Sequence, residues 1–161
     1  MHMRNQEERH FAVTLTHLER FRFSSQAHEN GALHGEPYVS DEPDPMGDAS
    51  GPSTPALLAS AVGHCLSASL LEMFRHAGLQ VSSYETEAVA VVALNDEGFP
   101  RIRRIEVCLK PELAIASPNI ERCIGVFERY CTVCQSVRPA FPVNVRVDYR
   151  ITSQAVAAVG A

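Results

Sequence analysis

The chain has 161 residues, of which 45% are hydrophobic and 20% are charged, and its formal net charge is −5. These values fit one packed globular domain and exclude a wholly disordered chain. The longest run of basic residues is the pair Arg103-Arg104. We therefore expect no binding to nucleic acid or to an anionic membrane surface, since both require a basic patch.

The N-terminus and the cysteines indicate the cellular compartment of the protein. Residues 1–9 are polar and charged, and no apolar stretch of the kind found in a signal peptide or a transmembrane helix follows them. We expect a cytoplasmic protein. The five cysteines are an odd number, and thiols stay reduced in such a compartment. A disulfide here is expected to be a state in a reaction, not a structural cross-link.

The first quarter of the chain has the pattern of antiparallel strands. Apolar and polar residues alternate over His10–Leu18, and the alternation resumes at Phe21–Phe23. Asn30-Gly31 is a pair that readily adopts the positive φ angles of a tight hairpin turn. Residues 40–55 are rich in proline, glycine and aspartate, which predicts a loop that leads into the next helix.

A long apolar helix is predicted next. Ser53 or Thr54 serves as N-cap, Pro55 occupies the first position, and Gly78 follows the last turn. Almost no polar side chain interrupts the helix before Glu72. A helix that is apolar all round must be surrounded by protein, and one sheet of a chain this short cannot surround it. We therefore expect a second subunit to supply the remaining cover.

The second half of the chain predicts a hairpin, a helix and a closing strand. Tyr84–Leu94 and Ile102–Leu109 are β-rich runs joined by a polar turn. Ser117-Pro118 starts an amphipathic helix whose apolar face continues to Cys131. Val143–Ile151 alternates again and predicts the last strand. Strands, a long helix, a hairpin, a helix, a short helix and a strand in this order indicate an α+β fold.

Three stretches of sequence stand out together. They are residues 51–65, which end in His64-Cys65; Phe99-Pro100-Arg101-Ile102 at the start of a strand; and Glu128-Arg129-Tyr130-Cys131-Thr132-Val133-Cys134. In order and spacing they resemble the OsmC and organic hydroperoxide resistance (Ohr) superfamily, and the third is most similar to the branch whose motif reads Tyr-Cys-Ser-Val-Ser. The resemblance implies a single OsmC-like domain over residues 1–161 with its core at about 10–151. It also implies an α+β fold in which a long central helix packs on antiparallel sheets, and an intertwined homodimer.

The same resemblance implies a chemistry. In the family, the cysteine at the position of Cys65 attacks a peroxide oxygen, and the cysteine at the position of Cys131 then forms a disulfide with it. This implies a cofactor-free peroxidase that reduces organic hydroperoxides in oxidative stress defence and is reset by a dithiol reductant. An arginine normally lies beside the first thiolate, and Arg20 or Arg22 stands at the matching part of this chain.

One departure from the family pattern leaves a second function open. Family members usually carry a glutamate near the start of the long helix, which pairs with that arginine. The corresponding positions here are Pro55 and Ala56. The alternative to a peroxidase is therefore a dimeric OsmC-fold protein that binds a small molecule or serves in stress without turning over peroxide.

The remaining cysteines have simpler interpretations. Cys131 and Cys134 form a C-x-x-C motif, but the chain has no second cysteine pair at metal-binding spacing, so we expect no metal site. We expect Cys131 to lie at the start of the segment 132–138, where the positive end of a helix favours a thiolate. Cys134 is either a packing residue or an alternative resolving cysteine. Cys108 and Cys123 are predicted to be structural.

Overall fold

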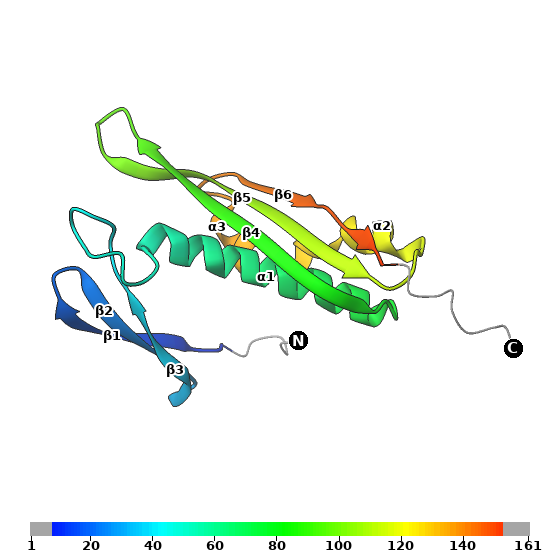
Figure 1. Cartoon of the computed structure of the whole chain (residues 1–161), viewed down its shortest axis with the longest axis horizontal. Coiled ribbons are helices and arrows are strands. Elements are labelled where there is room, and N and C mark those ends of the chain that lie inside the picture. Colours follow the sequence, from blue (N-terminus) through cyan, green and yellow to red (C-terminus); the bar gives the residue numbers. More distant parts are fainter. Residues whose placement is uncertain (1–7, 153–161) are drawn as a thin grey trace, which may run out of the picture. The chain divides into compact units, whose positions relative to one another are not determined.

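The computed structural model describes residues 8–152, which form two units, residues 8–54 and residues 55–152 (Figure 1). Each unit is described by itself. The ends of the predicted domain, residues 1–7 and 153–161, lie outside the described residues. The assignment of the whole chain to a single domain stays a prediction.

The first unit is built around an antiparallel sheet with the strand order β1-β2-β3, where β1 is Phe11–Glu19, β2 is Arg22–Glu29 and β3 is Ala32–Ser40. The turn between β2 and β3 contains Asn30 at φ 50° and Gly31 at φ 83°. Both angles lie in the left-handed region that this residue pair tolerates best. The strands and the hairpin predicted from the sequence are confirmed.

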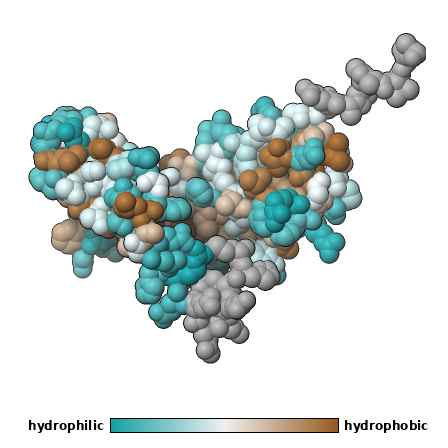
Figure 2. Space-filling model, turned by 90° about the horizontal axis from the view of Figure 1, so that it is seen from below, coloured by the Kyte–Doolittle hydropathy of each residue, from teal (hydrophilic) through white to brown (hydrophobic). Residues whose placement is uncertain are grey.

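The apolar side of β1 is uncovered within this unit. Phe11, Val13 and Leu15 alternate along the strand, and their exposed fractions range from 48% to 67%. Apolar patches are visible on the molecular surface in Figure 2. Exposed apolar side chains that follow a strand's alternation are typical of a sheet face that packs on further protein.

The loop after β3 is organised by one buried carboxylate. Asp41 accepts hydrogen bonds from the backbone N–H groups of Glu42, Asp48 and Ser50 at 2.8, 3.1 and 3.1 Å. The hydroxyl of Ser50 donates a fourth at 2.9 Å. These bonds, led by the Ser50 N–H, lower the pKa of Asp41 to about 2. The proline-rich segment is thus an ordered connection to the helix that follows.

The long helix α1, Thr54–His76, ends as the sequence predicted. Gly78 has φ 68°, and its N–H bonds to the carbonyl of Arg75 at 3.1 Å. The N–H of Leu79 bonds to the carbonyl of Phe74 at 2.9 Å. This pair of bonds is the Schellman motif, which satisfies the last carbonyls of a helix and requires a left-handed residue that glycine provides at low cost.

The second sheet contains a long hairpin of β4, Val81–Leu94, and β5, Pro100–Leu113, together with β6, Val143–Val147, and β7, Arg150–Ile151. The hairpin is antiparallel as predicted, but β6 and β7 both run parallel to β5. The sheet is therefore mixed, antiparallel in the predicted hairpin and parallel at this edge. The helical segments between β5 and β6 form the crossover that a parallel pair requires.

The core lies between α1 and one face of this sheet (Figure 1). Along β5, alternate residues point inward, and these side chains are almost completely buried. They pack with one stripe of α1; the cluster includes Val62, Leu66, Leu70, Phe74, Ile105, Val107, Leu109 and Leu113. At Gly63 a Cβ atom would lie 3.0 Å from the Cβ of Ala88 on β4, so the helix approaches the strand closely at this residue.

The opposite face of α1 is not covered by the rest of the second unit. Ala61, His64 and Ala68 are exposed, and Leu71 is 46% exposed. Within residues 55–152 this face of the helix therefore stays open, and cover by a second subunit stays a prediction. By length and composition α1 also meets the criterion for a membrane-spanning helix, a criterion that core helices of soluble proteins meet as well.

The amphipathic helix predicted from Ser117 to Cys131 is not continuous, whereas the short helical segment predicted over residues 132–138 is present. The chain forms α2, Asn119–Ile124, then the 3-10 turn η1, Phe127–Tyr130, and then α3, Thr132–Val137. Gly125 and Val126, which separate the first two, are poor helix formers, and Val126 leaves the helical region with φ −128°. These breaks place the cysteine motif at a bend instead of on one straight helix face.

Candidate active site

Three thiols meet in the second unit. Cys65 lies on α1 at the border of its buried stripe and is half-buried, whereas Cys131 and Cys134 are fully buried. Cys65 packs against the core cluster that contains Cys131, and the two thiols lie close enough for Cys65 to raise the pKa of Cys131. The Sγ of Cys131 also accepts the backbone N–H of Cys134 at 3.4 Å. The structure therefore brings Cys65 and Cys131 together, with Cys131 in the middle and Cys134 beside it.

The central thiol is held in its protonated form. Burial, followed by the interaction with Cys65, raises the pKa of Cys131 to about 12. The backbone N–H of Cys134 at the start of α3 lowers this pKa, as expected of a helix start, but burial outweighs the effect. Such a thiol is a poor nucleophile toward peroxide, but it can donate a proton and condense with an oxidised neighbour.

An ion pair beside these thiols was not predicted from the sequence. Arg138 pairs with the carboxylate of Glu128, and its guanidinium lies 3.5 Å from the carbonyl oxygen of Val143. Burial raises the pKa of Cys134, and the charge of Arg138 partly opposes this effect. Residues ten apart in a continuous helix lie about 15 Å apart along its axis. The bend at Cys131 brings Glu128 and Arg138 together, and their spacing in the sequence does not indicate this pair.

The two arginines proposed as partners of Cys65 have other partners within the first unit. Arg20 adopts a left-handed turn conformation with φ 49°, pairs with Asp48 and donates to the carbonyl of Pro45 at 3.1 Å. Arg22 pairs with Glu19 at 2.6 Å. A role of either arginine at Cys65 stays a prediction.

The start of α1 carries no carboxylate. Its first turn, which includes Pro55 and Ala56, contains no acidic residue. The glutamate expected from the family pattern is therefore not replaced by a neighbouring acidic side chain in that turn.

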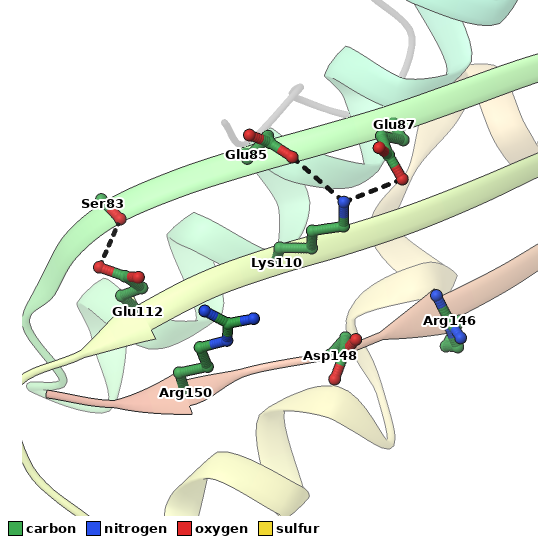
Figure 3. Close-up of a pocket in the computed structure, with 8 residues that line it drawn as sticks. All are labelled: Ser83, Glu85, Glu87, Lys110, Glu112, Arg146, Asp148 and Arg150. Carbon is green, nitrogen blue, oxygen red and sulfur yellow. Dashed lines mark hydrogen bonds and ion pairs between the residues drawn. The ribbon is translucent and has the colours of Figure 1, made fainter.

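The sheet face opposite α1 carries a polar hollow of about 530 Å³ (Figure 3). Lys110 extends between Glu85 and Glu87 and pairs with them at 3.1 and 2.9 Å. The Ser83 hydroxyl donates to Glu112 at 2.8 Å. Opposite charges compensate one another here, which is typical of a solvated sheet surface.

The remaining two cysteines have separate partners. Cys108, on the outer face of β5, lies 3.2 Å from a guanidinium nitrogen of Arg146. Cys123 is buried, and its Sγ lies 3.6 Å from the carbonyl oxygen of Met73. Within residues 8–152, no group of three or more histidine, cysteine, aspartate or glutamate side chains is arranged to hold a metal ion.

Comparison with known proteins agrees with the observed fold. The model of the family described as OsmC-like protein matches residues 47–146, while no curated protein matches the sequence. An OsmC-like protein of Vibrio cholerae has a TM-score of 0.67 and 15% identity, covering 89% of this chain and 100% of that one. An OsmC-like protein of Mycoplasma pneumoniae has a TM-score of 0.68 and 16% identity, covering 90% of this chain and 99% of that one. The organic hydroperoxide resistance protein OhrB of Bacillus subtilis has a TM-score of 0.56 and 15% identity, covering 86% of this chain and 98% of that one. The predicted α+β fold with its long helix is confirmed.

Proposed function

This chain belongs to the OsmC-like protein family, and on that premise we propose that it is a thiol-dependent peroxidase that reduces organic hydroperoxides through Cys65 and Cys131. The observation that carries the proposal is that the half-buried Cys65 packs against the core cluster of the buried Cys131, where the two thiols interact. Similarity to proteins that include organic hydroperoxide resistance proteins supports the choice of substrate class. The role in the cell is defence against oxidative stress.

The reaction divides between the two cysteines according to their surroundings. The Cys65 thiolate attacks one peroxide oxygen, the O–O bond breaks, and the substrate leaves as an alcohol after taking up a proton. Cys65 is then a sulfenic acid. The adjacent Cys131 thiol condenses with it, which forms a disulfide and releases water. A dithiol reductant restores both thiols and is itself oxidised to a disulfide, so the cycle uses no cofactor.

We place this activity in a cytoplasmic homodimer. Two apolar surfaces support a dimer: the exposed side of β1, with Phe11 and Leu15, and the exposed face of α1, with Leu71. A second copy of the chain offers matching apolar surfaces, and their burial is favourable by about 25 cal/mol per Å².

A dimeric binding protein without turnover is the second candidate, favoured by the absent carboxylate at Pro55 and Ala56. A groove of about 420 Å³ beside α1 offers a place for a small apolar molecule. It is lined by residues of α1 and β4, namely Ser60, Gly63, His64, Ser67, Ala68, Leu71, Tyr84, Thr86 and Ala88.

The consumption of cumene hydroperoxide in the presence of dithiothreitol separates the two candidates. The wild type is expected to consume peroxide above the background of the reductant, and Cys65→Ser is expected to fall to that background. Cys123→Ser is the matched control, because Cys123 is a buried cysteine with a different partner, the carbonyl of Met73. Equal consumption by the wild type and Cys65→Ser would reject the peroxidase and leave the binding protein.

A further inference from the structure

Cys134 is a feature of this chain that the two-cysteine cycle does not use. It occupies the position of the second serine in the Tyr-Cys-Ser-Val-Ser motif, so a nucleophilic thiol replaces a hydroxyl. The structure buries this thiol completely and sets it one helical turn from Cys131. Cys131 therefore has a thiol neighbour on each side, Cys65 and Cys134.

We propose that Cys134 accepts the oxidation from Cys65 in a three-cysteine relay, an inference that rests on the peroxidase function proposed above. After Cys65 and Cys131 have formed their disulfide, the Cys134 thiolate attacks the Sγ of Cys131. A new Cys131–Cys134 disulfide forms, the Cys65–Cys131 bond breaks, and Cys65 leaves as a thiolate. The exchange conserves the one disulfide, and the proton lost by Cys134 is available to Cys65.

The geometry at the bend suits this exchange. Cys131 is the N-cap of α3, and the 3.4 Å bond from the Cys134 N–H places its Sγ over the first turn of that helix. Residues three apart on a helix have Cβ atoms about 5–6 Å apart, and a disulfide needs about 3.5–4.5 Å. An N-cap residue lies outside the regular helix, and Cys131 has an extended backbone with ψ 101°. A rotation of its side chain and a small backbone shift therefore close the gap.

Arg138 supplies the positive charge that favours the attacking thiolate. Only the thiolate exchanges with a disulfide, and burial disfavours it at Cys134. The guanidinium of Arg138 acts in the opposite direction on the same thiol, and the carboxylate of Glu128 partly offsets it. Glu128 holds Arg138 in position through their ion pair.

The relay gives the oxidised protein two forms in exchange. In one form the oxidation is stored between Cys131 and Cys134, which are both fully buried, and Cys65 is again a thiol. The exchange is reversible, so the Cys65 thiolate can recover the disulfide at its own half-buried sulfur. There a dithiol reductant can attack Cys65, and the cycle ends with three free thiols.

Disulfide mapping tests the relay directly. Wild-type protein receives less than one molecule of cumene hydroperoxide per chain without reductant, is quenched in acid, alkylated and digested with trypsin. Cleavage after lysine and arginine, except before proline, places Cys65 in the peptide 23–75 and both Cys131 and Cys134 in the peptide 130–146. Cys108 and Cys123 fall in two further peptides, 105–122 and 123–129.

We expect most of the oxidised wild type to carry the disulfide within peptide 130–146, with Cys65 alkylated. Cys134→Ser and Cys134→Ala should instead link peptides 23–75 and 130–146, and Cys123→Ser should behave as the wild type. A wild type that carries only the Cys65–Cys131 link, with Cys134 alkylated at every time point, would overturn the relay but not the peroxidase. Absence of any peroxide-dependent oxidation of Cys65 would overturn both.

Discussion

The protonated state of Cys131 makes a quantitative prediction about stability and pH. Its pKa rises from the ordinary value of 9.0 to about 12 in the folded protein, chiefly because the thiol is buried. Above pH 9 the unfolded chain loses this proton while the folded protein keeps it. The contribution of Cys131 is therefore fully present below pH 9 and is lost as the pH rises toward 12. At pH 10, one pH unit above the unfolded pKa, the loss amounts to about 1 kcal/mol.

Urea unfolding at pH 7.5 and at pH 10 measures this loss, with a non-thiol reductant and fixed protein concentration. Between the two pH values the wild type should lose about 1 kcal/mol more of its unfolding free energy than Cys131→Ala. The cavity left by the alanine does not enter this difference, because it is the same at both pH values. Cys108→Ala, which removes a partly exposed thiol, is the control and should follow the wild type. Equal losses in the wild type and Cys131→Ala would refute the assignment of a buried, protonated Cys131.

Three further predictions concern packing, assembly and the ion pair. Gly63→Val should lower the free energy of unfolding by about 1–3 kcal/mol in denaturant titrations, because the added carbons overlap β4. Leu71 lies on the face of α1 proposed to pack in the dimer and is 46% exposed in the single chain. Leu71→Arg should therefore shift the mass measured by light scattering from dimer to monomer, with unchanged circular dichroism. The pKa of Cys134 can be measured from the rate of its alkylation as a function of pH. Arg138→Met should raise this pKa and Glu128→Gln should lower it, since the two charges act on the thiol in opposite directions. Shifts of the same sign in both variants would contradict the last prediction.

The parts of the fold that were predicted correctly are those that local signals determine. Alternation fixes β1 and the hairpin of β4 and β5, and the Asn30-Gly31 turn depends on two residues alone. The end of α1 at Gly78 depends on one glycine and its neighbours. The meeting of Cys65 with Cys131 has a different origin, since resemblance to the family implied it and no local pattern does.

The features that were missed depend on packing between distant segments. Gly125 and Val126 are weak helix formers, but each is tolerated in many helices, so the break between α2 and η1 is not evident from the sequence. The parallel pairing of β6 with β5 follows from the path of this broken segment. The pair of Glu128 and Arg138 was missed because the bend at the cysteine motif brings its members together, and their spacing in the sequence does not indicate it.

The most direct test of the central claim is to trap the first oxidised cysteine. In the double variant Cys131→Ser, Cys134→Ser both neighbouring thiols are removed, so a sulfenic acid should persist at Cys65 after treatment with cumene hydroperoxide and react with dimedone. We predict one adduct per chain, located in the tryptic peptide 23–75, whose one cysteine is Cys65. An adduct absent from that peptide, or equally abundant on Cys108 and Cys123, would contradict the account of Cys65 as the peroxide-reactive residue.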